Sequence, residues 1–199
     1  MAYFLGFFWA DGYIRKQTEL IIEITEEDGL KLQSIFNKVS MFKIYKRIRI
    51  NRKPQMSFVL YNPSVAELFK NLGKYPKSIE SHEKILNYIP QDYHIWFFRG
   101  LIDGDGCFYI NQNNKAMIQF SITNSYYFDW DFLQNYFIEN FQCNCQIKRR
   151  SHKNNTYHSS IIRLCGKTNV QRLISKLYSE TDGIYLPRKF NKVKEISFL

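Results

Sequence analysis

The sequence has no run of about 18 apolar residues, the shortest stretch that suits a helix crossing a bilayer. Its start, Met1-Ala2-Tyr3-Phe4, lacks the basic segment and small-residue cleavage site of a secretory signal. We therefore expect an intracellular protein without a presequence, in an organelle, a phage-infected cell or a bacterial cytoplasm. The four cysteines include no paired CxxC motif, and Cys143-x-Cys145 alone is a weak metal signal. Free thiols in a reducing compartment are the simpler interpretation.

Acidic residues are scarce beside basic ones. There are 18 Asp and Glu against 28 Lys and Arg, a formal net charge of +10. This excess favours a polyanionic partner, with nucleic acid ahead of an acidic membrane surface. Hydrophobic residues at 45% and aromatic residues at 17% can supply an ordinary core. The 199 residues are enough for one large domain or two small ones.

Two short stretches are near copies of each other. Gly6 to Gly12 has the sequence Gly-Phe-Phe-Trp-Ala-Asp-Gly, and Gly100 to Gly106 has Gly-Leu-Ile-Asp-Gly-Asp-Gly. Each is an apolar, helix-like segment with small residues four apart, so these residues share one helix face and allow close packing. Each ends in an Asp-Gly pair. If the helices pack side by side, Asp11 and Asp105 are delivered together, which suggests a metal site.

The elements that we predict follow one order twice. In the first half they are strands over Tyr13–Lys16 and Glu19–Ile24, a helix from Asp28 to Val39, strands over Lys43–Ile50 and Met56–Tyr61, and a helix from Pro63 to Gly73. In the second half they are a helix over Tyr93–Asp105, strands over Cys107–Asn111 and Lys115–Thr123, a helix over about Tyr126–Phe141, strands over Cys145–Ser151 and Tyr157–Leu164, a helix over Asn169–Tyr178 and a last helix from Pro187. A basic, partly irregular connector over Lys74–Gln91 joins the halves.

This order predicts an α+β fold made of a tandem, pseudo-twofold repeat of α-β-β-α-β-β-α units. We expect residues 1–91 to form the first repeat with the connector and residues 92–199 the second. Each repeat would carry a four-stranded antiparallel sheet with helices on one face and the other face open. A twofold protein suits a DNA duplex, whose strands are themselves related by twofold symmetry.

At this point the residues resemble a known family, the LAGLIDADG homing endonucleases in their single-chain form. Phe98-Arg99-Gly100-Leu101-Ile102-Asp103-Gly104-Asp105-Gly106 is close to the family motif. Phe4-Leu5-Gly6-Phe7-Phe8-Trp9-Ala10-Asp11-Gly12 diverges more, because Trp9 stands where the family often has its first aspartate. The two motifs are at domain spacing and have matching strands downstream, so the resemblance covers nearly the whole chain.

The resemblance implies a monomeric double-strand DNA endonuclease. Such an enzyme recognises a long site, cuts across the minor groove and leaves short 3′ overhangs. A terminal His-Asn of an intein is missing, so an intron-encoded or free-standing enzyme is preferred. Two alternatives stay open: an RNA-binding maturase that assists its host intron, and a cleavage-inactive DNA-binding regulator of the same fold.

Phosphodiester hydrolysis needs an activated water and neutralised transition-state charge, which divalent metals on carboxylates supply. We expect Asp11 and Asp105 to be catalytic and to bind Mg²⁺, with the backbone carbonyls of Ala10 and Gly104 as further ligands. Mn²⁺, or Ca²⁺ in a non-cleaving complex, are the other candidate ions. A single Asp-Gly pair usually marks a turn, but duplication favours the metal site. Asp103 has no counterpart in the first half, so we expect a polar or capping role beside the interface.

The resemblance also implies one basic catalytic group per half, after the last helix of each repeat. The corresponding candidates are Lys77 and Lys189, although each could instead be a simple phosphate contact.

Strand alternation predicts which side chains leave the helix-covered face and meet DNA. These candidates are Lys43, Tyr45, Arg47, Arg49 and Asn51 in the first half, and Gln119, Ser121, Gln146, Lys148, Arg150 and His152 in the second. Ile44, Ile48 and Ile50 should point the other way. Arg and Lys suit guanine and phosphate, and Asn and Gln suit adenine. A solvated sheet would more usually balance Lys with Glu. Glu19 and Glu23 are exceptions that could accept from cytosine or discourage wrong bases.

Overall fold

The computed structural model describes residues 1–48, 50–51, 53–74, 81–111, 113, 117–124, 129–151 and 158–198. Its first half contains α1 (Ala2–Asp11), β1 (Gly12–Arg15), β2 (Glu19–Thr25), α2 (Glu26–Asn37), β3 (Lys43–Arg47), β4 (Gln55–Tyr61) and α3 (Pro63–Asn71). A short helix α4 (Glu83–Tyr88) and the turn η1 (Gln91–Tyr93) lead to the second half. That half contains α5 (His94–Asp105), β5 (Cys107–Ile110), β6 (Ile118–Asn124), α6 (Asp131–Phe141), β7 (Gln146–Ser151), β8 (His158–Cys165), α7 (Lys167–Tyr178) and α8 (Pro187–Ser197).

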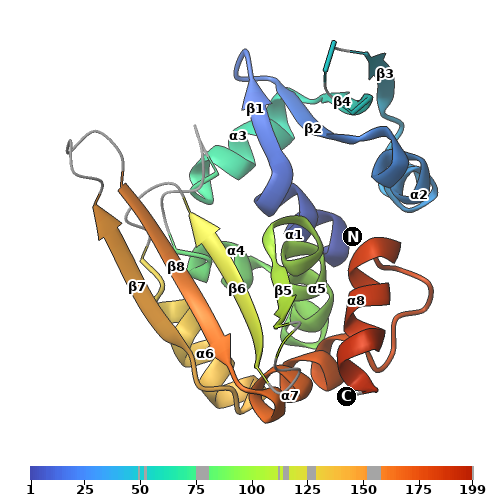
Figure 1. Cartoon of the computed structure of the whole chain (residues 1–199). Coiled ribbons are helices and arrows are strands. Elements are labelled where there is room, and N and C mark those ends of the chain that lie inside the picture. The colour runs from blue at the N-terminus through green and yellow to red at the C-terminus, as the bar shows by residue number, and fades with distance from the viewer. Residues whose placement is uncertain are drawn as a thin grey trace.

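The two halves have the same sheet topology. The first sheet has the strand order β1-β2-β4-β3 and the second has β5-β6-β8-β7 (Figure 1). All neighbouring strands are antiparallel. The predicted α+β class and tandem repeat are thus confirmed. Among the helices in the described ranges, none combines the length and the apolar character that crossing a bilayer requires.

Local sequence signals account for several element ends. Thr25 caps α2, since its hydroxyl accepts from the backbone N–H of Asp28 at 3.3 Å. Asn62 caps α3 in the same way, accepting from the N–H of Val65 at 3.1 Å, and Pro63 follows at the first helical position, where its missing N–H costs nothing. These caps fix the point at which each strand gives way to a helix.

Each of the two hydrophobic cores contains a residue from the other half of the chain. One core lies under the first sheet and the other under the second, and α1 and α5 lie side by side between them (Figure 1). Trp9 of the first half is buried in the second core, whereas Leu186 of the second half is buried in the first. The halves are therefore packed into one body by interdigitating side chains, in addition to the contact between their first helices.

One local expectation was wrong. The strand predicted over Lys43–Ile50 ends at Arg47, and Ile48 and Ile50 are 86% and 93% exposed instead of facing inward. Pairing stops at Arg47 opposite Gln55, so the alternation that would bury the later residues stops there too. The connector also contains a helix, α4, which the sequence did not suggest. The start predicted for α6 at about Tyr126 falls on residues 125–128, outside the described part of the chain.

Candidate functional site

The helices α1 and α5 touch through their backbones at two glycines. A Cβ atom placed on Gly6 would lie 1.9 Å from the carbonyl oxygen of Phe97. One placed on Gly100 would lie 2.0 Å from the carbonyl oxygen of Tyr3. Only glycine permits such an approach. The close packing predicted from the small residues four apart is therefore present, and the two helices end beside each other.

This packing brings the two motif aspartates together. A Cβ on Gly104 would lie 2.4 Å from the Cβ of Ala10 and 3.2 Å from Oδ2 of Asp11. Burial and the negative charge of Asp105 raise the pKa of Asp11 to about 6. Desolvation by the surrounding protein also raises the pKa of the Asp105 carboxyl group, although the residue as a whole is exposed. Two carboxylates held against their mutual repulsion form a place for a cation.

The donor set fits a hard divalent ion with several water ligands. Within the described ranges, no group of three or more His, Cys, Asp and Glu residues forms a fuller metal site. An ion at the seam would thus use Asp11 and Asp105, with the carbonyl groups of Ala10 and Gly104 in the same helix ends. Mg²⁺ commonly takes one or two protein carboxylates and keeps waters.

Two lysines place positive charge beside the aspartates. The ammonium of Lys74, which is only 2% exposed, donates to the carbonyl oxygen of Trp9. Lys189, in the first turn of α8, donates to the carbonyl oxygen of Gly106. Each lysine lowers the pKa of both Asp11 and Asp105 against the larger effect of burial. The structure thus places predicted Lys189 at the site.

Lys74 is a site residue that the sequence analysis missed. The candidate chosen there, Lys77, lies outside the described residues. Lys74 directly follows the glycine that was predicted to end the helix, three positions before Lys77. The two lysines therefore belong to the same segment after that helix. Its burial beside the rings of Phe8 and Trp9, with the ammonium 5.8 Å from each ring centroid, depends on tertiary packing that no local pattern reveals.

A partly buried ion pair crosses between the halves next to the aspartates. The Nε of Arg188, in α8, donates to Asp28 of α2 at 2.8 Å to Oδ2 and 3.1 Å to Oδ1. Asp28 is 7% exposed, and the positive charge of Arg188 also lowers the pKa of Asp11. Arg188 therefore ties the second half's last helix to the first half while adding positive charge at the seam.

Asp103 has no counterpart in the first half, and a polar or capping role beside the helix interface was predicted for it. The structure places it in such a polar role. It is 0% exposed and accepts three hydrogen bonds: from Tyr3 Oη at 2.8 Å, from Tyr178 Oη at 2.6 Å and from the backbone N–H of Leu186 at 2.7 Å. Burial raises the pKa of Asp103 to about 6, although these hydrogen bonds oppose the shift. The residue ties α1, α7 and the segment before α8 to α5, and its carboxylate is not available to a ligand.

We expect Asp103→Ala to lower the free energy of unfolding by about 3–5 kcal/mol, because it leaves three buried donors without an acceptor. Tyr3→Phe removes one of these bonds and should cost about 1 kcal/mol. Urea unfolding of the two variants measures both effects. Equal stability of Asp103→Ala and the wild type would contradict the structural role.

His82 predicts a pH effect on stability. The residue is 5% exposed, and burial together with the positive charge of Lys74 lowers its pKa from 6.5 to about 3. The unfolded chain takes up the proton first, so His82 removes stability as the pH falls from 6.5 towards 3, by about 2 kcal/mol at pH 5. Asp11 and Asp103, with raised pKa values, act in the opposite direction.

Because these opposing groups are present in both proteins, the test compares the wild type with His82→Asn. Between pH 7 and pH 5, the midpoint of urea unfolding should fall by less in the variant than in the wild type. Parallel pH dependence in the two proteins would contradict this assignment.

The open faces of the sheets carry the predicted polar set where the structure describes it. Lys43, Tyr45 and Arg47 are exposed on β3, and Gln146 and Lys148 are exposed on β7. Gln119 and Ser121 are partly buried on β6. Asn51 is exposed, but it lies in the turn after β3 at φ 62° and not on the strand. Arg49, His152 and the side chain of Arg150 lie outside the description.

The two acidic exceptions on the first sheet are held by arginines. Arg15 Nε donates to Glu19 at 2.6 Å, and Arg47 lies 3.4 Å from Glu23. The hydroxyl of Ser57 also donates to Glu23 at 3.4 Å. These contacts neutralise part of the charge on the open face of the first sheet.

A further open-face residue was missed, Arg163 in β8. It pairs across the sheet with Ser121 on one side and Gln146 on the other. Its neighbours Ile162 and Leu164 are buried in the core, so the alternation in this strand could have identified it.

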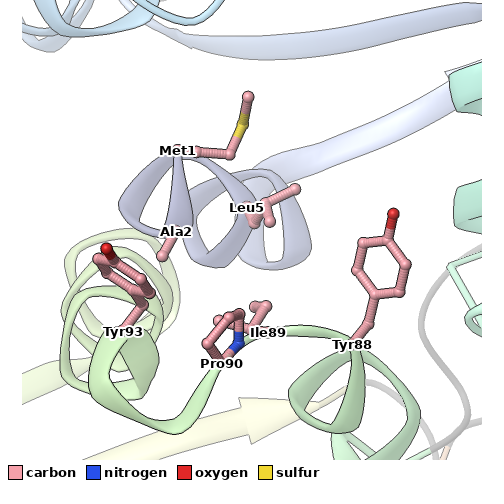
Figure 2. A pocket seen from close by; sticks show the side chains of 7 residues that line it. All are labelled: Met1, Ala2, Leu5, Tyr88, Ile89, Pro90 and Tyr93. Carbon is pink, nitrogen blue, oxygen red and sulfur yellow. The ribbon is translucent and has the colours of Figure 1, made fainter.

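The apolar pocket in Figure 2 lies away from the aspartates. It has a volume of about 440 Å³ and lies between the start of α1 and the α4–η1 connector. Its lining residues are Met1, Ala2, Leu5, Tyr88, Ile89, Pro90 and Tyr93. Since Asp11 is at the opposite end of α1, this pocket is separate from the candidate metal site.

Comparisons with known proteins agree with this architecture. Residues 92–178 match the family model of the LAGLIDADG-like domain. A sequence comparison with curated proteins gives no match. Among solved structures, the homing endonuclease I-WcaI bound to its DNA recognition sequence has a TM-score of 0.63 and 17% identity, over 96% of this chain and 84% of that one.

Two further structures are similar over nearly all of this chain. I-DmoI in complex with DNA and Ca has a TM-score of 0.58 and 14% identity, over 98% of this chain and 96% of that one. Full-length DUF199/WhiA from Thermatoga maritima has a TM-score of 0.59 and 12% identity, over 99% of this chain and 58% of that one. Residues 92–178 therefore match a LAGLIDADG-like domain, and the chain has, over 96% of its length, the fold of the LAGLIDADG homing endonucleases.

Proposed function

We propose that this protein is a site-specific, metal-dependent endonuclease that cuts both strands of a long DNA target across the minor groove and leaves short 3′ overhangs. The observation that carries the proposal is the pair Asp11 and Asp105, one from each half, held together at the seam between two equivalent sheets. The net charge of +10 and the basic, acid-poor open face of β7 support a DNA partner.

Asp11 and Asp105 would hold the divalent ion, with the carbonyls of Ala10 and Gly104 as further ligands. When bound, Mg²⁺ would activate a water and neutralise charge on the scissile phosphate. The protein's own contribution is to bring the two carboxylates together and to place Lys74 and Lys189 beside them. Ammonium groups there stabilise negative charge that develops on the phosphate.

Each sheet would lie along one half of the target, so that the pseudo-twofold axis of a monomer coincides with that of the DNA. Lysine and arginine side chains on the open faces would contact phosphates and fix the register, and polar side chains would contact base edges. The solved structures of the same fold that are bound to DNA support a DNA partner.

A second candidate is a DNA-binding regulator without cleavage. The similarity to DUF199/WhiA favours keeping it, because that protein shares the fold and is not named as a nuclease. Nothing in the described residues favours intron RNA over DNA as the partner.

The test is incubation of the purified protein with a library of double-stranded DNA in Mg²⁺, in Ca²⁺ and in EDTA. The endonuclease proposal expects cutting at one family of sites in Mg²⁺ and uncut, bound DNA of the same sequence in Ca²⁺. Selective binding without cutting under every condition, with Mn²⁺ included, would instead support the regulator. Absence of selective binding would reject both candidates.

A further inference from the structure

The two sheets have the same topology but different side chains at equivalent positions of their open faces. Equivalent positions are identified from the pairing registers of the strands, counting from Asp11 in the first half and from Asp105 in the second. The residue two positions after Asp11 starts a cross-strand row made of Tyr13, Ile21, Val59 and Lys43. The residue two positions after Asp105 starts the matching row, made of Cys107, Ser121, Arg163 and Gln146. We call these the first row and the second row.

The centre of the first row is apolar. Ile21 is 2% exposed although it does not belong to the core under the sheet, and Val59 beside it is partly buried. Neither side chain can donate or accept a hydrogen bond. The first row therefore offers a base edge nothing but apolar contact at its centre.

The centre of the second row is polar and contains a donor that lacks an acceptor. Nε of Arg163 is buried and has no hydrogen-bond partner within the described chain. A buried donor of this kind costs stability unless a ligand or water satisfies it or its neighbours shift. Ser121 and Gln146 flank Arg163 across the strands and are themselves hydrogen-bonding residues.

Arg163 also differs from the arginines of the first sheet. Arg15 and Arg47 are held by Glu19 and Glu23, which compete with any other acceptor. The described residues of the second row include no carboxylate, and Nε of Arg163 has no acceptor within the described part of the chain. Its planar fork matches the O6 and N7 acceptors of guanine in the major groove.

We propose that Arg163 determines specificity for a guanine in the half-site bound by the second sheet, and that the equivalent base pair of the other half-site is not selected as guanine. The inference rests on the proposed DNA-binding function. It predicts an asymmetric target at this pair of positions, where the pseudo-twofold fold alone would suggest a palindrome. Other outward residues of the two sheets can add their own preferences without changing this one.

The test selects bound sequences from a randomised duplex library in Ca²⁺ for the wild type, Arg163→Gln and Arg163→Met. The wild type should prefer guanine at one position by roughly 5- to 150-fold, the range for one bidentate pair. Arg163→Met should lose this preference. Arg163→Gln should move it towards adenine, which glutamine contacts through N6 and N7. Thermal unfolding of each variant identifies any that fails to fold, and Arg163→Leu, which also removes every side-chain donor, then replaces it.

Two matched variants complete the design. Arg172→Met removes an exposed arginine from α7, whose side chain donates to the carbonyl oxygen of Gln142, and should leave the selected sequence unchanged. Val59→Ala, at the equivalent position of the first row, should leave the guanine preference intact. If folded Arg163→Met selects the same guanine as the wild type, the inference is overturned. If the wild type selects no DNA at all, the proposed function itself fails.

Discussion

Asp105→Asn should lower the rate of DNA cleavage in Mg²⁺ by at least about 10³-fold while leaving the target bound. The change removes one carboxylate of the pair but keeps its size and its place at the end of α5. Binding should stay equal or become tighter, because the variant carries one negative charge fewer beside the phosphates. Asp11→Asn should behave in the same way, since the two halves contribute equivalent ligands. Single-turnover cleavage and binding in Ca²⁺ measure the two effects separately.

Asp182→Asn is the control for this pair. Asp182 is an exposed aspartate in the turn before α8, and the same loss of charge there should leave the cleavage rate within about twofold of the wild type. A cleavage rate for Asp105→Asn equal to that of Asp182→Asn would remove Asp105 from the metal site. Loss of binding in Asp105→Asn would show that the carboxylate acts on the fold or on the DNA instead of on the reaction.

Gly100→Ala should lower the free energy of unfolding by more than about 3 kcal/mol, a large part of the roughly 5–15 kcal/mol that stabilises a typical domain. The new methyl group would lie 2.0 Å from the carbonyl oxygen of Tyr3, so the two motif helices must move apart. Gly6→Ala makes the equivalent contact with Phe97, at 1.9 Å, and should cost a similar amount. Chemical unfolding followed by circular dichroism measures these losses.

Gly29→Ala is the matched helical substitution. Its methyl group would meet the side chain of Met56, with Sδ at 2.7 Å and Cβ at 2.9 Å. The thioether can turn aside more easily than a carbonyl, whereas Cβ moves only with its backbone. Alanine also favours a helix over glycine by about 1 kcal/mol, which offsets part of the clash. We expect a smaller loss than for Gly100→Ala. Equal losses at Gly29 and Gly100 would contradict the special closeness of the α1–α5 contact.

The parts of the site that the sequence predicts are those defined by local periodicity. Small residues four apart determine how closely two helices can approach, and the Asp-Gly pair follows at a fixed position, so the meeting of Asp11 and Asp105 could be inferred before any coordinates. Strand alternation likewise identified Lys43, Tyr45 and Lys148 as outward-facing, because every residue in a paired strand obeys a period of two.

Features that depend on where one segment ends or on a distant partner could not be predicted in this way. Ile48 and Ile50 continue an alternating pattern, but the strand that would bury them stops pairing at Arg47. Lys74 becomes a site residue only because its chain segment passes over the end of α1. Trp9 and Leu186 cross into the opposite cores, an exchange that is invisible when each repeat is considered alone.

Under the proposed function, the seam would let one chain act on two DNA strands in the same way. Each half provides one helix, one carboxylate at its end and one open sheet, and a lysine lies near each carboxylate. The described parts of the two halves differ in packing partners, such as Trp9 against Asp103, in their last helices and in their open faces. Under the proposed function, chemistry would be shared across the axis while recognition would differ between the two sides.

The most direct test of this account is to map, at single-nucleotide resolution, the ends of both strands after cleavage of the selected target in Mg²⁺. The account predicts one cut in each strand, related by the pseudo-twofold axis and separated so that both products carry short 3′ overhangs. The same cuts should be missing in EDTA and in Asp105→Asn. Cleavage of a single strand, cleavage with 5′ overhangs, or unchanged cleavage in Asp105→Asn would contradict a paired site at the α1–α5 seam.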